Sequence, residues 1–97
     1  MVKHIVFWTL ADQEKKHASE HAEMLRGKFK ALLGVVDGLE AIEVGANYNG
    51  GDFDLALDCT FSSREAEAAY QNHPGHLEIK KIVHSLVAGR ACVDYEI

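Results

Sequence analysis

The sequence predicts an α+β fold in which one four-stranded antiparallel sheet is covered by helices. An apolar run opens the chain, an amphipathic helical pattern follows, and two strand-like runs then flank a turn sequence. A broken helix and a last alternating run complete the chain. The order strand, helix, strand, strand, helix, strand is a split βαβ repeat, which indicates a ferredoxin-like fold. At 97 residues the chain can bury only one core, so we expect a single domain over residues 1–97.

The first strand and first helix are predicted from a change in apolar spacing. Residues 2–9 are almost continuously apolar and rich in β-formers, whereas residues 12–33 carry apolar side chains at helical spacing. Asp12 is a suitable N-cap for this helix, and Gly34 stands where a helix C-terminus favours the left-handed conformation. The sequence GVVDG is then a connector.

The next two strands are predicted to form a hairpin. Residues 39–47 and 53–61 flank the sequence YNGGD, whose Asn-Gly pair is typical of a tight reversal between antiparallel strands. Ser62 with Glu65 three positions later is a capping-box pattern, so we expect a second helix to begin there.

The second helical region is predicted to be broken. Pro74 ends or kinks the helix that follows the hairpin. A further helix is expected from about residue 76 to residue 87, and the sequence RACVDYEI alternates as a last strand.

The two cysteines are predicted to be free and buried. In a sheet of strand order 4-1-3-2, Cys59 on the third strand and Cys92 on the fourth are separated by the first strand, roughly 10 Å by the usual strand spacing. A disulfide requires Cα atoms within about 7 Å. The thiols and the lack of a targeting segment favour a reducing, cytoplasmic location.

The first strand predicts a homodimer. His4, Val6 and Trp8 alternate with Ile5 and Phe7, so both of its faces are suited to burial. The helices of this short chain can cover only one face. We therefore expect the other face to pack against the same sheet of a second copy.

Charge and composition exclude two classes of partner. The formal net charge is −5, and the ten Lys and Arg residues form no basic stripe of the kind that binds nucleic acid. The same balance argues against anionic membranes, and no apolar run approaches the roughly 20 residues of a membrane span.

The sequence YQNHPGH is the strongest candidate for chemistry. Tyr70 and His73 are three residues apart on a predicted helix, and the break at Pro74 lets His76 turn back toward them. His4 lies on the expected helix-facing side of the first strand. The structural alternative is that His4 is a hydrogen-bonded core residue, that His73 caps the end of one helix and that His76 starts the next.

Two histidines beside a tyrosine suit proton transfer better than metal binding. A neutral imidazole can accept a proton and a phenol can donate to an enolate oxygen. A zinc site would require more soft or anionic ligands than His4, His73 and His76 alone.

Two other histidine features are given no role. The sequence HASEH, residues 17–21, has the H-x-x-E-H spacing of one class of zinc peptidases, but it lies in the polar first half of a surface helix of a very small domain. We interpret it as a solvated helix face. His84 is interpreted as a partly exposed surface residue.

Five blocks of the sequence resemble the stress-responsive A/B barrel (Dabb) family. They are VKHIVFW at the start, EVGAN at 43–47, CTFSSREA at 59–66, YQNHPGH at 70–76 and VDYEI at 93–97. The resemblance implies a dimeric α/β barrel made from two ferredoxin-like sheets.

The family includes a plant polyketide cyclase, and the resemblance carries its residues to matching positions here. It implies that His4 and His76 are a catalytic pair, with His76 as general base, and that Tyr70 assists. A plant relative binds magnesium through main-chain carbonyls, which correspond to Leu33, Val36 and Leu39 here.

Three functions follow from the sequence. The first is a small dimeric Dabb protein of undetermined biochemical role, with a pocket between sheet and helices, lined by His4, Trp8, Tyr70, His73 and His76, that could hold a small apolar ligand. The second is an enzyme, a proton-transferring cyclase, lyase or isomerase acting on a small carbonyl compound. The third is a structural stress protein without a ligand. An open cavity faced by both His4 and His76 would favour the enzyme.

Overall fold

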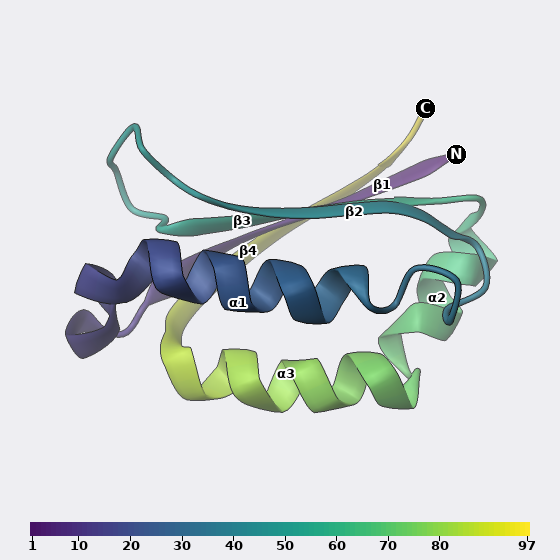
Figure 1. Ribbon diagram of the computed structural model, residues 1–97. Coiled ribbons are helices and arrows are strands. Elements are labelled where there is room, and N and C mark those ends of the chain that lie inside the picture. Colours follow the sequence, from purple (N-terminus) through teal and green to yellow (C-terminus); the bar gives the residue numbers. More distant parts are fainter.

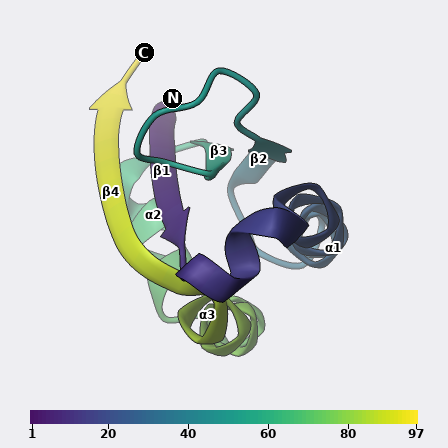
Figure 2. The ribbon, with the colours of Figure 1, turned by 90° about the vertical axis from the view of Figure 1, so that its left-hand side faces the viewer.

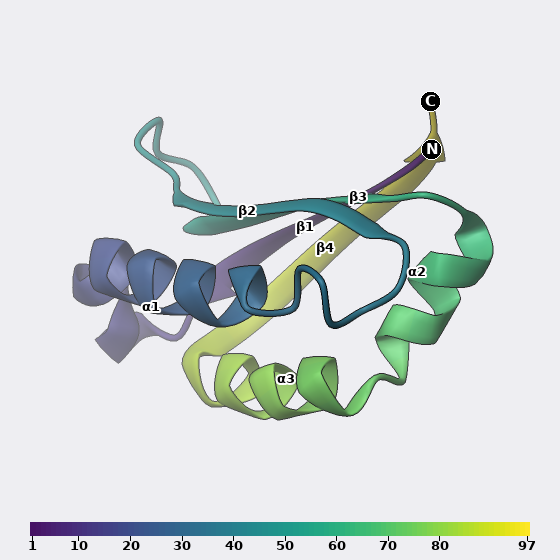
Figure 3. The same cartoon turned by 45° about the vertical axis from the view of Figure 1, so that its right-hand side comes forward.

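The computed structural model describes residues 1–97. In chain order its elements are β1 (Val2–Leu10), the 3-10 helix η1 (Asp12–His17), α1 (Ala18–Lys30), β2 (Leu39–Ala46), β3 (Leu55–Phe61), α2 (Arg64–Gln71), α3 (Pro74–Leu86) and β4 (Val87–Glu96). The strands form one antiparallel sheet in the order β2-β3-β1-β4. Helices α1 and α3 lie on one side of this sheet, and α2 lies at one end of it (Figures 1 and 3). The predicted ferredoxin-like α+β fold is confirmed.

The core lies between the sheet and the helices. Alternate residues of β1 and β3 are buried on this side because successive side chains of a strand point to opposite faces. Helix α1 contributes Ala22, Leu25 and Phe29, and the Phe29 ring stacks on Trp8 with centroids 6.1 Å apart. The core comprises 19 buried residues. They come from β1, β2 and β3, from the three α-helices and from the connector that follows α1.

The first helical region differs from the prediction at both ends. Residues 12–17 form a 3-10 helix, and the α-helix begins at Ala18 and ends at Lys30. The prediction of Asp12 as an N-cap is wrong, because the capping position is Ala11 and no side chain caps it. Gly34 does adopt the left-handed conformation, with φ of 82°, but it lies in the middle of the connector between Lys30 and Leu39.

The hairpin turn is longer than the Asn-Gly pair predicted. The Asn47 amide N donates to the Asp54 carbonyl (2.9 Å), and the chain between them forms an extended loop, in which Gly50 and Gly51 have positive φ. The Asn47 side-chain amide stabilises this loop by donating to the Gly50 and Phe53 carbonyls, both at 2.8 Å.

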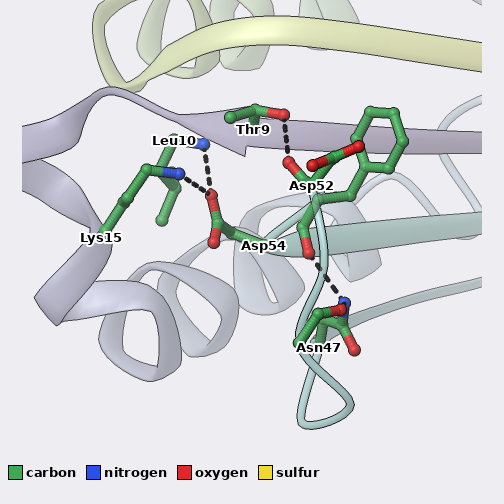
Figure 4. A network of polar contacts seen from close by, with 8 residues as sticks. Thr9, Leu10, Lys15, Asn47, Asp52 and Asp54 are labelled. Carbon is green, nitrogen blue, oxygen red and sulfur yellow. Dashed lines mark hydrogen bonds and ion pairs between the residues drawn. The ribbon is translucent and has the colours of Figure 1, made fainter.

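The base of this loop is attached to the end of β1. Asp54 accepts hydrogen bonds from the Leu10 amide (2.8 Å) and the Lys15 ammonium (2.9 Å), and the Thr9 hydroxyl donates to the Asp52 carbonyl at 2.6 Å (Figure 4). Burial opposes ionisation of Asp54, but the contacts with Lys15 and Leu10 outweigh it, and the pKa of Asp54 is lowered.

Helix α2 is capped one residue later than predicted. Ser63 accepts a hydrogen bond from the Ala66 amide at 3.1 Å, so the cap is Ser63 and not Ser62. Helix α2 ends at Gln71, and Pro74 occupies the first turn of α3, where its missing N–H costs nothing. The predicted break is therefore present, and α3 begins two residues earlier than expected.

The cysteines are free, as predicted. Cys59 pairs with His4 across β3 and β1, and Cys92 pairs with Val6 across β4 and β1, so the central strand separates them. Burial raises the pKa of the Cys59 thiol to about 12. Cys92 is only partly buried.

The sheet face away from the helices is apolar and exposed. Phe7 is 37% exposed, Val93 57% and Tyr95 48%, and the register places Ile5 beside Val93 and Phe7 beside Ala91 on this outer face. Within one chain, then, β1 is buried on one side only. No helix is long and apolar enough to span a lipid bilayer.

Candidate functional site

A cavity of about 650 Å³ lies between the helix-facing side of the sheet and α3. Its size is in the range of small-molecule sites. In Figure 2 the strand β4 curves toward α3 at its start, and the first four residues of β4, 87–90, line the cavity. The lining residues are His4, Val6, Trp8, Phe29, Leu57, Tyr70, Gln71, His76, Lys80, Val83, His84, Val87, Ala88, Gly89 and Arg90.

Four of the five predicted pocket residues line this cavity. His4 and Trp8 come from β1, Tyr70 from the last turn of α2 and His76 from the first turn of α3. The fifth, His73, is absent from the lining. It is the N-cap of α3, where its Nδ1 accepts a hydrogen bond from the Gly75 amide at 3.0 Å. The structural role that the sequence left open for His73 is thus a cap, at the start of α3 and not at the end of α2.

Tyr70 lies between the two candidate catalytic histidines. Its ring stacks on His76, with centroids 4.1 Å apart and planes inclined by 27°. It meets His4 edge to face, with centroids 6.1 Å apart. This arrangement depends on the helix break, because Pro74 ends one helix and redirects the chain so that His76 returns over Tyr70.

His4 is held by a carboxylate. It is 3% exposed, and its Nδ1 lies 2.5 Å from Asp94 Oδ1 on the neighbouring strand. Glu67 Oε2 lies 3.6 Å from the same nitrogen. With Nδ1–H donating to Asp94, the Nε2 lone pair is free to accept a proton, as in other carboxylate-histidine pairs.

The environment of Glu67 disfavours its charge. Burial raises the pKa of Glu67, and the negative charge of Asp94 raises it further, although His4 opposes this. Asp94 and Glu67 both lie beside the His4 ring, so burial first and the charge of Asp94 second favour the protonated form of Glu67.

His76 and Tyr70 have the protonation states that proton transfer from carbon requires. Burial lowers the pKa of His76, and the charge of Lys80 lowers it further, so the imidazole is neutral at pH 7. Burial raises the pKa of Tyr70, which keeps the phenol protonated. The Tyr70 hydroxyl is fully buried and makes no close hydrogen bond in the protein. The polar side chain beside it is the Cys59 thiol, which adds to the rise in the pKa of Tyr70.

Ligand atoms of His4, Cys92 and Asp94 lie within 4.8 Å of one another, as a metal site would require. However, His4 Nδ1 and Asp94 Oδ1 are only 2.5 Å apart, whereas two ligands of a tetrahedral zinc ion are separated by about 3.3 Å. Burial raises the pKa of Cys92, and Asp94 adds to this effect, so the thiol is protonated. His4, Cys92 and Asp94 therefore form a hydrogen-bonded cluster, and their spacing does not fit a zinc site.

The magnesium prediction concerns the connector between α1 and β2. Leu33 and Val36 lie there and Leu39 is the first residue of β2, and the Val36 carbonyl accepts a hydrogen bond from the Leu39 amide at 3.2 Å. A carbonyl has a second lone pair, and backbone oxygens suit a hard cation. The magnesium site stays a prediction.

Sequence reasoning missed the charged groups of the cavity. Lys80, His84 and Arg90 all line it, and His84 had been given no role. One signal was present in the sequence, because His76, Lys80 and His84 are spaced by four residues and therefore share a face of α3. The histidines of HASEH behave as expected of a surface helix, since His21 pairs with Glu14 (2.7 Å) and His17 with Glu20 (3.3 Å).

Comparison with known proteins identifies the family. The model of the stress responsive A/B barrel domain matches residues 2–97. The chain belongs to the Dabb family. No match was found among curated proteins.

Solved structures agree with this assignment. A dimeric protein of unknown function with a ferredoxin-like fold from Bacteroides fragilis is 34% identical, with a TM-score of 0.85 over 99% of this chain and 95% of that one. An Arabidopsis thaliana protein is 24% identical, with a TM-score of 0.82 over 100% of this chain and 95% of that one. The hydroxynitrile lyase of Passiflora edulis shares the fold at 19% identity, with a TM-score of 0.78 over 99% of this chain and 92% of that one. Similarity at these two lower identities is evidence of fold alone.

Proposed function

We propose that this Dabb protein is an enzyme that moves a proton on a small carbonyl compound bound between the sheet and α3, as a cyclase, lyase or isomerase. The observation that carries the proposal is that His4, Tyr70 and His76 line one cavity, with Tyr70 in contact with both histidines. The Passiflora edulis protein of the same fold is named as a hydroxynitrile lyase, so the fold is compatible with chemistry of this general kind.

In the proposed reaction, neutral His76 removes a proton from the carbon next to the substrate carbonyl. The electron pair of the broken C–H bond moves toward the carbonyl oxygen, and the resulting enolate oxygen accepts a hydrogen bond from the Tyr70 hydroxyl. His4, fixed by Asp94, orients the substrate from the sheet side and presents Nε2 as a second proton acceptor. The proton on His76 then returns to carbon or to a leaving group.

Simple ligand binding is the second candidate function. The apolar part of the lining favours it, because Val6, Trp8, Phe29 and Leu57 are each no more than 4% exposed and would hold any compact apolar molecule. Binding alone gives no reason for two histidines to flank an unpartnered phenol. A purely structural role gives no reason for a cavity of about 650 Å³.

We also propose that the protein is a homodimer formed by packing the outer faces of two sheets. Exposed Phe7, Val93 and Tyr95 support this, as do solved neighbours described as dimeric. A location in the cytoplasm is proposed as well, supported by two thiols that are not joined in a disulfide.

Exchange of carbon-bound protons tests the catalytic proposal. With cyclohexanone in D₂O, the native protein should accelerate loss of the α-proton NMR signal, and His76→Gln should reduce this acceleration by about 100-fold or more. The surface variant His17→Gln is the matched control and should retain the native rate. If the native protein produced no acceleration with cyclohexanone or with a panel of small ketones, or if His76→Gln were as active as His17→Gln, the catalytic proposal would be rejected.

A further inference from the structure

We propose that the ligand of this cavity carries an anionic group, such as a carboxylate, which binds between Lys80 and Arg90 at the cavity opening while the apolar part of the ligand lies against Trp8 and Phe29. The inference rests on the proposed function in using the same cavity, and it adds the charge class of the substrate.

The distribution of charge along the lining carries the inference. The chain has 15 acidic residues and a net charge of −5, yet the cavity lining contains no Asp or Glu. It contains Lys80 and Arg90, together with three histidines. Neither Lys80 nor Arg90 belongs to any of the ion pairs of the protein, whereas Lys81, the next residue along α3, pairs with Glu78 at 3.2 Å. Two cations that belong to no ion pair therefore reach a cavity whose lining has no acidic residue, and the carboxylates of Asp94 and Glu67 contact the lining residue His4.

The two cations reach the cavity from two different elements, α3 and β4. Lys80 follows His76 by one helical turn on α3. Arg90 is directly opposite Trp8 in the pairing of β4 with β1, so both side chains are on the helix-facing side of the sheet. Lys80 and Arg90 are solvent-exposed, whereas Trp8 is 4% and Phe29 1% exposed. The cavity thus has a cationic rim and an apolar interior.

An anion at this rim would also assist the proposed base. Burial is the main cause of the lowered pKa of His76, and the charge of Lys80 lowers it further. A bound anion would offset part of that charge and so raise the pKa of His76 toward its ordinary value, which makes the imidazole a stronger base when the substrate is in place. Binding of an anionic substrate and proton abstraction are therefore compatible in one site.

Two fluorescent probes with the same ring system separate charge from apolar contact. One is 8-anilinonaphthalene-1-sulfonate, and the other is N-phenyl-1-naphthylamine, which lacks the sulfonate. Trp8 is the only tryptophan of the chain and lines the cavity, so energy transfer from Trp8 reports binding of either probe. The variants are Lys80→Gln, Arg90→Gln and the double variant, with Lys81→Gln as the matched control on the same helix.

Each single variant should weaken binding of the sulfonate about three- to tenfold, since exposed ion pairs contribute modestly. The double variant should weaken it at least tenfold, while the affinity for the neutral probe changes less than twofold and Lys81→Gln changes neither. Equal losses for both probes, or unchanged sulfonate binding in the double variant, would overturn the inference. If the double variant failed to fold, a salt titration of the native protein would decide, because only the sulfonate should bind more weakly as NaCl is raised.

The probe titration and the exchange assay test different claims, so one claim can be rejected while the other stands. If the protein accelerates exchange but its probe binding does not depend on charge, the proposed function stands and the inference of an anionic substrate is rejected. Charge-dependent binding without any exchange would leave a binding protein for anions.

Discussion

The two faces of the sheet are made by the same strands but differ in burial and in the polar groups that they carry. The helix-facing side borders a cavity at which His4 is buried and hydrogen-bonded to Asp94, whereas the outer face exposes Phe7, Val93 and Tyr95. Because side chains alternate along a strand, each residue of β1 is committed to one of these environments. Apolar residues on the inner face form the core, those on the outer face form the proposed surface for a second copy, and polar residues within the inner face form the candidate site.

The largest difference in the free energy of unfolding is expected when a phenylalanine on each face is replaced by alanine. Phe61 on the inner face is fully buried, and Phe7 on the outer face is 37% exposed. Phe61→Ala should lower the free energy of unfolding by about 3–5 kcal/mol, because a buried ring leaves a cavity. Phe7→Ala should lower it by less than about 1.5 kcal/mol per monomer, as measured by urea denaturation at low protein concentration. Equal losses would show that the two faces do not differ as described.

A charge on the outer face should act on assembly and leave the fold intact. Phe7→Asp should raise the dimer dissociation constant by at least about 100-fold, because two carboxylates would be buried against apolar surface. Sedimentation velocity at micromolar concentration measures this, and far-UV circular dichroism checks that the sheet persists. Lys28→Asp, a change on the helix side, is the control and should remain dimeric. A native protein that sediments as a monomer would refute the proposed interface.

Much of the fold was predictable because its elements depend on local signals. The apolar alternation of β1, the helical spacing before Gly34 and the break at Pro74 are each encoded within a few residues. Boundaries were less accurate where two signals compete. Ser62 and Ser63 both have a capping side chain, and the structure uses Ser63.

The site was predictable in its histidines and not in their partners. His4 could be placed on the cavity side from the alternation of β1, and His76 from the helix break at Pro74. Asp94 and Arg90 could not, because their positions depend on the pairing of β4 with β1, which joins residues about 90 positions apart. His73 was misplaced because its ring serves the local backbone of α3, an interaction that competes with any role in the cavity.

Glu67, which lies on α2 beside His4, should make the stability of the protein depend on pH in a defined direction. The folded-state pKa of Glu67 is raised above its ordinary value, so the charged form costs stability once the pH exceeds that ordinary value. Glu67→Gln should therefore stabilise the protein slightly at pH 7, by less than about 1 kcal/mol, and have little effect near pH 4, where Glu67 is protonated in both states. Thermal denaturation at the two pH values measures the difference.

Asp54, at the base of the hairpin loop, is the control because its pKa is shifted in the opposite direction to that of Glu67. Its folded-state pKa is lowered, so its charged form contributes stability that is lost as the pH falls through the folded-state pKa. Asp54→Asn should destabilise the protein at pH 7, and its effect should fade in strong acid. The same sign for both variants would contradict the contrast between these two carboxyl groups.

The smallest effect on stability is expected from Tyr70→Phe, which separates the role of the ring from that of the hydroxyl. The ring packs against Phe61 and His76, with centroids 5.0 and 4.1 Å away, and phenylalanine retains those contacts. The hydroxyl is buried without a partner in the protein, so its removal should change the free energy of unfolding by less than about 0.5 kcal/mol or increase it. If the hydroxyl serves the substrate oxygen, the same variant should nevertheless lower the rate of ketone proton exchange about tenfold or more. Tyr70→Phe that retained full exchange activity would assign the phenol a packing role and restrict the chemistry of the cavity to the two histidines.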